Sequence, residues 1–135
     1  MSVTEFPHTA DVKLQVRAPS LEILFSETFD ALMQVMYGKD RKGGISREIT
    51  LQSASNEALL ADFLSEVLYV SEVDGLVFSR ADIRISTGTL AATLDGEPFD
   101  RTRHAGGSEV KGISYSGLSI AHDTNGYMLD IIFDV

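Results

Sequence analysis

The chain has 135 residues, of which 44% are hydrophobic, and it contains no cysteine. A chain of this length buries an adequate core in one unit, so we expect residues 1–135 to form a single domain; the missing cysteines exclude disulfide bonds, thiolate zinc sites and cysteine nucleophiles. The formal net charge of −9 argues against autonomous binding of nucleic acid, which depends on Lys and Arg neutralising phosphates. No apolar run is long enough to cross a bilayer and the first residues lack a secretory signal, so we expect a soluble, cytoplasmic protein with no membrane partner.

The first predicted strand leads directly into the first predicted helix. Residues 11–17 alternate between polar and apolar side chains, which is typical of a half-buried strand. Apolar residues then recur at helical intervals from Leu21 to Met36, preceded by Ser20 as an N-cap and followed by Gly38 as a stop signal. This pattern predicts an amphipathic helix whose apolar face packs against a sheet.

A second strand and a second helix repeat this order. Residues 48–52 alternate briefly, which predicts a short strand. A wide apolar stripe begins near Ser55 and continues to Leu68, and Asp74-Gly75 marks the end of the helix. This is the strongest helix signal in the chain.

The second half of the chain predicts only strands and turns. The strand signals lie at residues 76–85, 89–94, 110–120 and 127–135. The alternation changes phase around Gly117, which predicts a bulge, and residues 95–109 predict a loop long enough to be functional. The element order is therefore β-α-β-α-β-β-β-β, and we expect an α+β sandwich with two helices packed on one face of a largely antiparallel sheet.

The closing strand places acidic groups at one end of the predicted sheet. Asp134 lies beside the carboxylate of Val135, and Asp11 opens the first strand. Because domain termini often lie close together, these three groups are placed to converge on one cation. Three oxygen donors without imidazole or thiolate suit calcium, magnesium or manganese rather than zinc. By spacing alone, the segment from His8 to Asp11 is more simply a turn that begins a strand.

Several motifs, in this order and at these separations, resemble the archease family over nearly the whole chain. They are His8-Thr-Ala-Asp11, Glu57-Ala-Leu-Leu60, Leu64-Ser-Glu-Val-Leu68, Gly96-Glu-Pro-Phe-Asp100, Arg103-His104, Glu109-Val-Lys111 and Phe133-Asp134-Val135. The resemblance implies an archease-like fold and a protein cofactor of an RtcB-type RNA ligase, which joins RNA ends in tRNA splicing and RNA repair. It implies that the protein promotes GTP-dependent guanylylation and multiple turnover of the ligase, meets RNA and GTP only through the ligase, and is not itself an enzyme.

The resemblance also implies which residues bind the metal ion. It assigns this role to Asp11, Asp134 and the carboxylate of Val135, the three groups that the strand pattern places together. His8 lies three residues before Asp11 in a predicted turn. We therefore expect His8 to hydrogen-bond near the metal rather than to bind it.

Lys111 is the residue that the resemblance makes important for activation of the ligase. An exposed lysine near the acidic groups would attract a phosphate of a nucleotide or RNA end. Strand parity leaves the facing of this side chain open, because the alternation changes phase further along the strand. Neutralisation of Glu109 or Asp100 is the simpler alternative.

Two other classes of function remain open on the sequence. A metal-dependent hydrolase of phosphate esters would also use a carboxylate-bound ion, although the chain has no Gly-rich phosphate loop and no telling Ser-His arrangement. A general chaperone or adaptor of nucleic-acid-modifying enzymes would bind its partners through an acidic surface. The sequence leaves open the oligomeric state, the physiological ion and the RNA substrate of the ligase.

Overall fold

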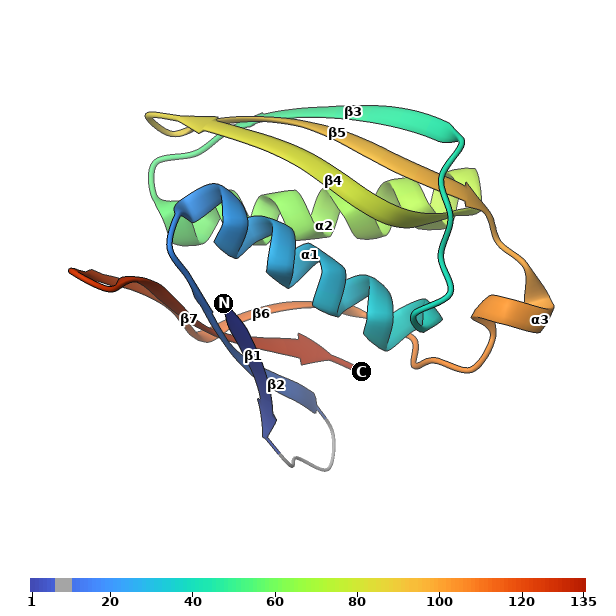
Figure 1. Cartoon of the computed structure of the whole chain (residues 1–135). Helices are drawn as coiled ribbons and strands as arrows, with labels where there is room; N and C mark the ends of the chain where they lie inside the picture. The colour runs from blue at the N-terminus through green and yellow to red at the C-terminus, as the bar shows by residue number, and fades with distance from the viewer. Residues whose placement is uncertain (7–10) are drawn as a thin grey trace.

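The computed structural model describes residues 1–6 and 11–135 of the chain (Figure 1). Its strands are β1 (Ser2–Phe6), β2 (Asp11–Ala18), β3 (Ile45–Gln52), β4 (Leu76–Ser86), β5 (Thr89–Pro98), β6 (Gly112–Asp123) and β7 (Gly126–Asp134). Its helices are α1 (Leu21–Tyr37), α2 (Asn56–Asp74) and the short α3 (Arg101–His104).

The strands form two antiparallel sheets, with the two long helices between them (Figure 1). One sheet has the order β1-β2-β7-β6 and the other has the order β3-β5-β4. Helix α1 contacts β4 of one sheet and β2 of the other, while α2 contacts β3 and β6. The predicted α+β class and the predicted order of elements are confirmed, and the structure adds β1 before the predicted first strand and α3 after β5. The strands form two sheets where the sequence predicted one, because alternation along a strand does not indicate which other strand it pairs with.

The hydrophobic core fills the layer that the helices occupy. The buried residues of α1 are Leu24, Phe25, Thr28, Phe29, Leu32 and Met33. The rings of Phe25 and Phe29 lie 6.2 and 6.3 Å from that of Phe63 on α2, within the range of favourable aromatic pairs. Phe133 and Ile131 of β7 are buried on the helix side of the four-stranded sheet. Each sheet therefore has one face against the helices and one face toward solvent.

The helix ends follow the capping residues that the sequence indicates. The hydroxyl of Ser20 accepts a hydrogen bond from the Ile23 N–H at 3.2 Å, and that of Ser55 accepts one from the Ala58 N–H at 3.1 Å. Gly75 ends α2 in the left-handed conformation, with φ 63°. These contacts satisfy backbone donors and acceptors that a helix end otherwise leaves without partners.

The predicted bulge near Gly117 is confirmed. The register between β6 and β7 shifts between Ser114 and Ser119, and Gly117 has a φ of 73°. A positive φ at an inserted position favours glycine, because a side chain there would strain the backbone. The bulge explains why residues before and after Gly117 alternate out of phase.

The predicted long loop at residues 95–109 is mostly ordered into regular structure. Strand β5 continues to Pro98, and α3 occupies Arg101–His104. The carboxylate of Asp100 begins α3 by accepting a hydrogen bond from the Thr102 N–H at 2.9 Å. The segment without regular structure is therefore shorter than the sequence indicates, because long-range contacts extend β5 along β4.

No helix in the described part of the chain is both long enough and apolar enough to cross a membrane.

Candidate functional site

Strands β2, β7 and β6 bring three of the predicted site residues to one end of the four-stranded sheet. Asp11 is the register partner of Asp134, so the two residues lie directly opposite each other on neighbouring strands. On the other side of β7, the N–H of Lys111 donates a hydrogen bond to the Asp134 carbonyl at 2.7 Å. We call Asp11, Lys111 and Asp134 the acidic edge.

The carboxylates of the acidic edge lie on the solvent face of the sheet. Phe133 is buried against the helices, and successive side chains of a strand point to opposite faces, so Asp134 points away from the core. Direct cross-strand partners share a face, typically with Cβ atoms about 5 Å apart, which places Asp11 beside Asp134. Val135 follows Asp134 directly and is 36% exposed. His8 lies outside the described residues.

The donor set at the acidic edge fits a hard cation. Two carboxylates on one face are oxygen ligands of the kind that calcium and magnesium prefer, and magnesium often takes only one or two from the protein. Within residues 1–6 and 11–135, no three His, Asp or Glu side chains are grouped so as to hold a metal ion. A third oxygen at this edge would therefore come from the main chain of Val135 or from another molecule.

Lys111 is held at the acidic edge through its backbone, and its side chain is exposed. In the described part of the chain, its ammonium group forms no ion pair with Glu109 or Asp100, so the simpler alternative raised by the sequence is not realised. Asp100 pairs instead with Arg103, at 3.2 Å. Lys111 is thus available to a group from outside the chain.

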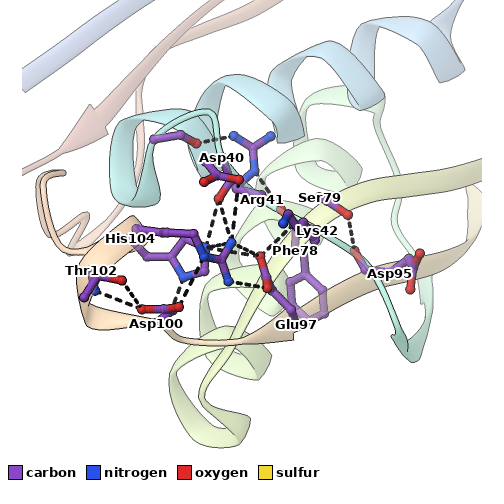
Figure 2. Close-up of polar contacts among 12 residues, drawn as sticks. Asp40, Arg41, Lys42, Phe78, Ser79, Asp95, Glu97, Asp100, Thr102 and His104 are labelled. Carbon is purple, nitrogen blue, oxygen red and sulfur yellow. Dashed lines mark hydrogen bonds and ion pairs between the residues drawn. The ribbon is translucent and has the colours of Figure 1, made fainter.

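A second group of charged residues surrounds α3 (Figure 2). The Arg103 guanidinium donates to both carboxylate oxygens of Glu97, at 2.6 and 2.8 Å, and to Asp100 at 3.2 Å. His104 lies in the same group and is 1% exposed. We call Glu97, Asp100, Arg103 and His104 the α3 cluster.

The hydrogen bonds of His104 define the tautomer of its neutral ring. Nδ1 accepts from the Asp100 N–H at 2.9 Å, so the ring proton of the neutral form is on Nε2. Nε2 lies 3.0 Å from the Asp40 carbonyl and 3.2 Å from the Glu97 carboxylate, and both are acceptors (Figure 2). His104 therefore joins the loop after α1 to the end of β5, which is a structural role.

The charges of the α3 cluster stabilise one another. The hydrogen bond from Arg103 lowers the pKa of Glu97 from 4.5 to about 2. The hydroxyl of Thr102, followed by its N–H, lowers the pKa of Asp100 from 3.8 to about 2. The pKa of Arg103 is raised in turn, chiefly by its hydrogen bonds to Glu97. All three groups stay charged at neutral pH, so this cluster is unsuited to proton transfer.

The segment that leads from α3 to Lys111 packs against the end of α1. The Ser108 N–H donates to the Val35 carbonyl at 2.9 Å, and Val110 is buried. A Cβ atom on Gly107 would lie 2.1 Å from the Met36 carbonyl oxygen, so only glycine permits this approach. These contacts set the position of Lys111 at the acidic edge.

Sequence reasoning missed two residues of this arrangement. It did not indicate that Asp40 accepts from His104, or that Gly107 packs on the Met36 carbonyl. Both contacts join segments more than sixty positions apart, and neither residue belongs to a motif with a local spacing. For Gly107, the only local signal is the Gly-Gly pair at 106–107, which is also typical of a plain loop.

Comparison with known proteins places the chain among related sequences and structures. Residues 4–135 match the family model described as the Archease protein family. Among curated proteins, the chain is 35% identical to protein archease of Methanosarcina barkeri over 134 residues, covering 95% of this chain and 92% of the relative. It is 31% identical to protein archease of Pyrococcus abyssi over 137 residues, covering 96% of each.

Two solved structures share the fold. The solution structure of protein 1598 of Methanobacterium thermoautotrophicum superimposes with a TM-score of 0.85 at 22% identity, covering 98% of each chain. The crystal structure of an archease from Thermotoga maritima, described as a possible chaperone, superimposes with a TM-score of 0.69 at 19% identity, covering 96% of this chain and 94% of that one. At these identities the likeness concerns the fold alone.

Proposed function

The chain belongs to the archease family, and on that premise we propose that it is a protein cofactor of an RtcB-type RNA ligase in the cytoplasm and not itself an enzyme. It promotes the GTP-dependent guanylylation of the ligase and its multiple turnover, in tRNA splicing or RNA repair. RNA and GTP are contacted only through the ligase, since a chain with a net charge of −9 repels free polyphosphates. The observation that carries the proposal is the pairing of Asp11 with Asp134 beside the anchored Lys111.

The proposed metal ligands are Asp11, Asp134 and the carboxylate of Val135. Calcium, magnesium and manganese suit this all-oxygen set, whereas zinc prefers imidazole or thiolate. A bound divalent cation would bring positive charge close to the site at which the ligase binds nucleotide phosphates. Asp11 and Asp134 hold their carboxylates side by side on one face, so neither strand has to move for both to contact one ion.

The proposed role of Lys111 is to attract a phosphate of the ligase-bound nucleotide or RNA end. Its side chain is exposed, and Lys111 directly precedes β6, with its N–H bonded to the Asp134 carbonyl, so we expect it to meet the same part of the partner as Asp11 and Asp134 do. A lysine ammonium acts as a compact, mobile point charge, which suits a phosphate that moves between steps.

The test is a ligation assay with a purified RtcB-type ligase, RNA ends, GTP and a divalent ion, with and without this protein. We expect faster guanylylation and repeated ligation when it is present. Asp134→Asn should abolish most of the stimulation, because it removes one of the paired carboxylates. Asp123→Asn is the matched control: it removes the same charge at the end of β6, in the exposed hairpin that joins β6 to the opposite end of β7. An unchanged guanylylation rate with the wild-type protein would refute the cofactor role, and phosphate release by this protein alone would identify a hydrolase instead.

A general chaperone is the second candidate, because the Thermotoga maritima structure is described as that of a possible chaperone. Its distinguishing property is suppression of aggregation of unrelated proteins. The measurement is light scattering of a heated, unrelated enzyme with and without this protein. If scattering falls while guanylylation of the ligase is unaffected, the protein is a general chaperone and not a cofactor of the ligase.

A further inference from the structure

A groove lies beside the acidic edge, between the ends of the long helices and the segment that leads to Lys111. Its volume is about 390 Å³. It is lined by Met36 and Tyr37 of α1, Leu68 and Glu72 of α2, and Phe99 with residues 104–110, Gly106 excepted. This volume is near the lower end of the range for small-ligand sites, about 300–1,000 Å³, and suits a long side chain better than a large cofactor.

One wall of the groove is aromatic. Phe99 is 48% exposed, although Tyr37 and His104 support it, with ring centroids 6.2 and 5.9 Å away. An aromatic ring fixed by two neighbours and still half open to solvent is a platform for another group. Both ring nitrogens of His104 already have partners, so this side chain adds shape to the wall but no free hydrogen-bonding group.

The charges in the groove are all of one sign. Glu72 and Glu109 are exposed lining residues, and the lining includes no Lys or Arg. Among the described residues, neither glutamate forms a hydrogen bond or an ion pair through its carboxylate. By contrast, both carboxylate oxygens of Glu97, which precedes Glu109 in the chain, accept hydrogen bonds from Arg103. Within the described part of the chain, the groove thus has acceptors for a cation and no Lys or Arg in its lining.

We infer that this groove receives an arginine side chain from a segment of the partner ligase, an inference that rests on the proposed function. The guanidinium would lie over the Phe99 ring and bind the carboxylates of Glu72 and Glu109, while its aliphatic stem covers Leu68 and Met36. Arginine combines a planar cation that stacks on aromatic rings with an apolar stem, and it is common at the centre of protein interfaces.

The chemistry of the groove favours arginine over the other obvious occupants. A phosphate of RNA or a nucleotide would be repelled by the two glutamates, and a purely apolar side chain would leave their carboxylates facing it without partners. Lysine would pair with the glutamates but cannot present a flat group to Phe99. Val110 lines the groove and Lys111 follows it at the acidic edge, so one ligase molecule would contact both sites.

The experiment measures the dissociation constant of the complex with an RtcB-type ligase by calorimetry, at low and at high salt. The double variant Glu72→Gln, Glu109→Gln removes both charges with little change of shape. We expect binding about tenfold or more weaker at low salt and a smaller dependence on salt, because paired charges are screened by ions. Phe99→Ala should also weaken binding. The matched control is Glu48→Gln, Asp82→Asn, two exposed residues that are both register partners of Thr93 in the three-stranded sheet, and it should bind as the wild type does.

Three other results would contradict the inference, and each points to a different explanation. If the double variant binds like the wild type with the same salt dependence, while the wild type still stimulates guanylylation, the groove inference is wrong and the cofactor role stands. If Phe99→Ala alone weakens binding, an apolar group occupies the groove and not an arginine. If the wild type neither binds nor stimulates the ligase, both proposals fall. Thermal unfolding of each variant identifies loss of fold. We expect the smallest loss in the double variant Glu72→Gln, Glu109→Gln, because it changes the shape of the side chains least.

Discussion

The α3 cluster and the acidic edge contain the same kinds of groups in opposite arrangements. In the α3 cluster, Arg103 contacts Glu97 and Asp100 directly, and the pKa values of both carboxylates are lowered. In the acidic edge, the lysine is exposed and joined to Asp134 through the backbone rather than through its charge. Charges that neutralise one another stabilise a fold, whereas an exposed lysine that forms no ion pair within the described residues is available to a ligand. The two regions should therefore respond differently to substitution.

We expect the largest effect on stability from Gly107→Ala, which changes the segment between the α3 cluster and the acidic edge. The new Cβ would lie 2.1 Å from the Met36 carbonyl oxygen, so the segment or the end of α1 must move. We expect the free energy of unfolding to fall by about 1–3 kcal/mol, with a loss of ligase stimulation as Lys111 shifts. Denaturant unfolding and the guanylylation assay measure the two effects.

Gly106→Ala is the matched control for this substitution, because a Cβ there meets nothing within 4 Å. It should leave both stability and stimulation close to those of the wild type. Equal effects at the two positions would show that the packing against α1 is unimportant.

Arg103→Ala should lower the melting temperature while leaving metal binding at the acidic edge intact. It removes the cation that contacts both Glu97 and Asp100 and leaves those carboxylates without that partner. Arg103→Lys should restore only part of the loss, because an ammonium cannot donate to both oxygens of Glu97 in the same geometry. Melting curves of the two variants test this, and a melting temperature unchanged by Arg103→Ala would remove the stabilising role of the cluster.

Acid should destabilise the protein through the α3 cluster. Glu97 and Asp100 have pKa values of about 2 in the folded chain, against usual values of 4.5 and 3.8. Because the folded-state pKa values are the lower ones, their contribution to stability is complete above about pH 5 and is lost as the pH falls toward 2. Unfolding measured across this range should show a decline that is smaller in Arg103→Ala, and parallel curves for the two proteins would contradict the assignment.

Asp134→Asn should change stability by less than about 0.5 kcal/mol, because exposed polar substitutions of this kind are usually tolerated, and we combine it with Asp11→Asn in a double variant. The double variant should instead lose the stabilisation that a bound ion confers. Millimolar calcium or magnesium should raise the melting temperature of the wild type and not that of the variant. The same rise in both proteins would place the ion elsewhere.

Lys111→Ala should have the smallest structural effect of the series. Its N–H bond to Asp134 belongs to the backbone and survives the substitution. We expect stimulation of the ligase to fall while the metal-dependent rise in melting temperature is retained. Loss of both properties would mean that Lys111 has a structural role.

Much of the fold was predictable because its signals are local. Ser20 and Ser55 begin their helices as capping residues, and the change of phase near Gly117 marks a real bulge. The order of α1 and α2 among the strands followed from the periods of their apolar residues. The prediction that Asp11 and Asp134 meet also came from the sequence, and the register confirms that they are neighbours. Whether they bind a metal ion stays a prediction.

The sequence by itself determined the two long helices, their ends and the residues that strand alternation assigns to one face, since these depend on neighbours along the chain. Only the tertiary structure decided that the strands divide into two sheets around the helices. It also decided that Glu97 contacts both Arg103 and His104. Contacts between distant segments carry no periodic signal, because the energy of such a contact depends on how several elements are packed at once. For the same reason, the close approach of Gly107 to α1 is visible only in three dimensions.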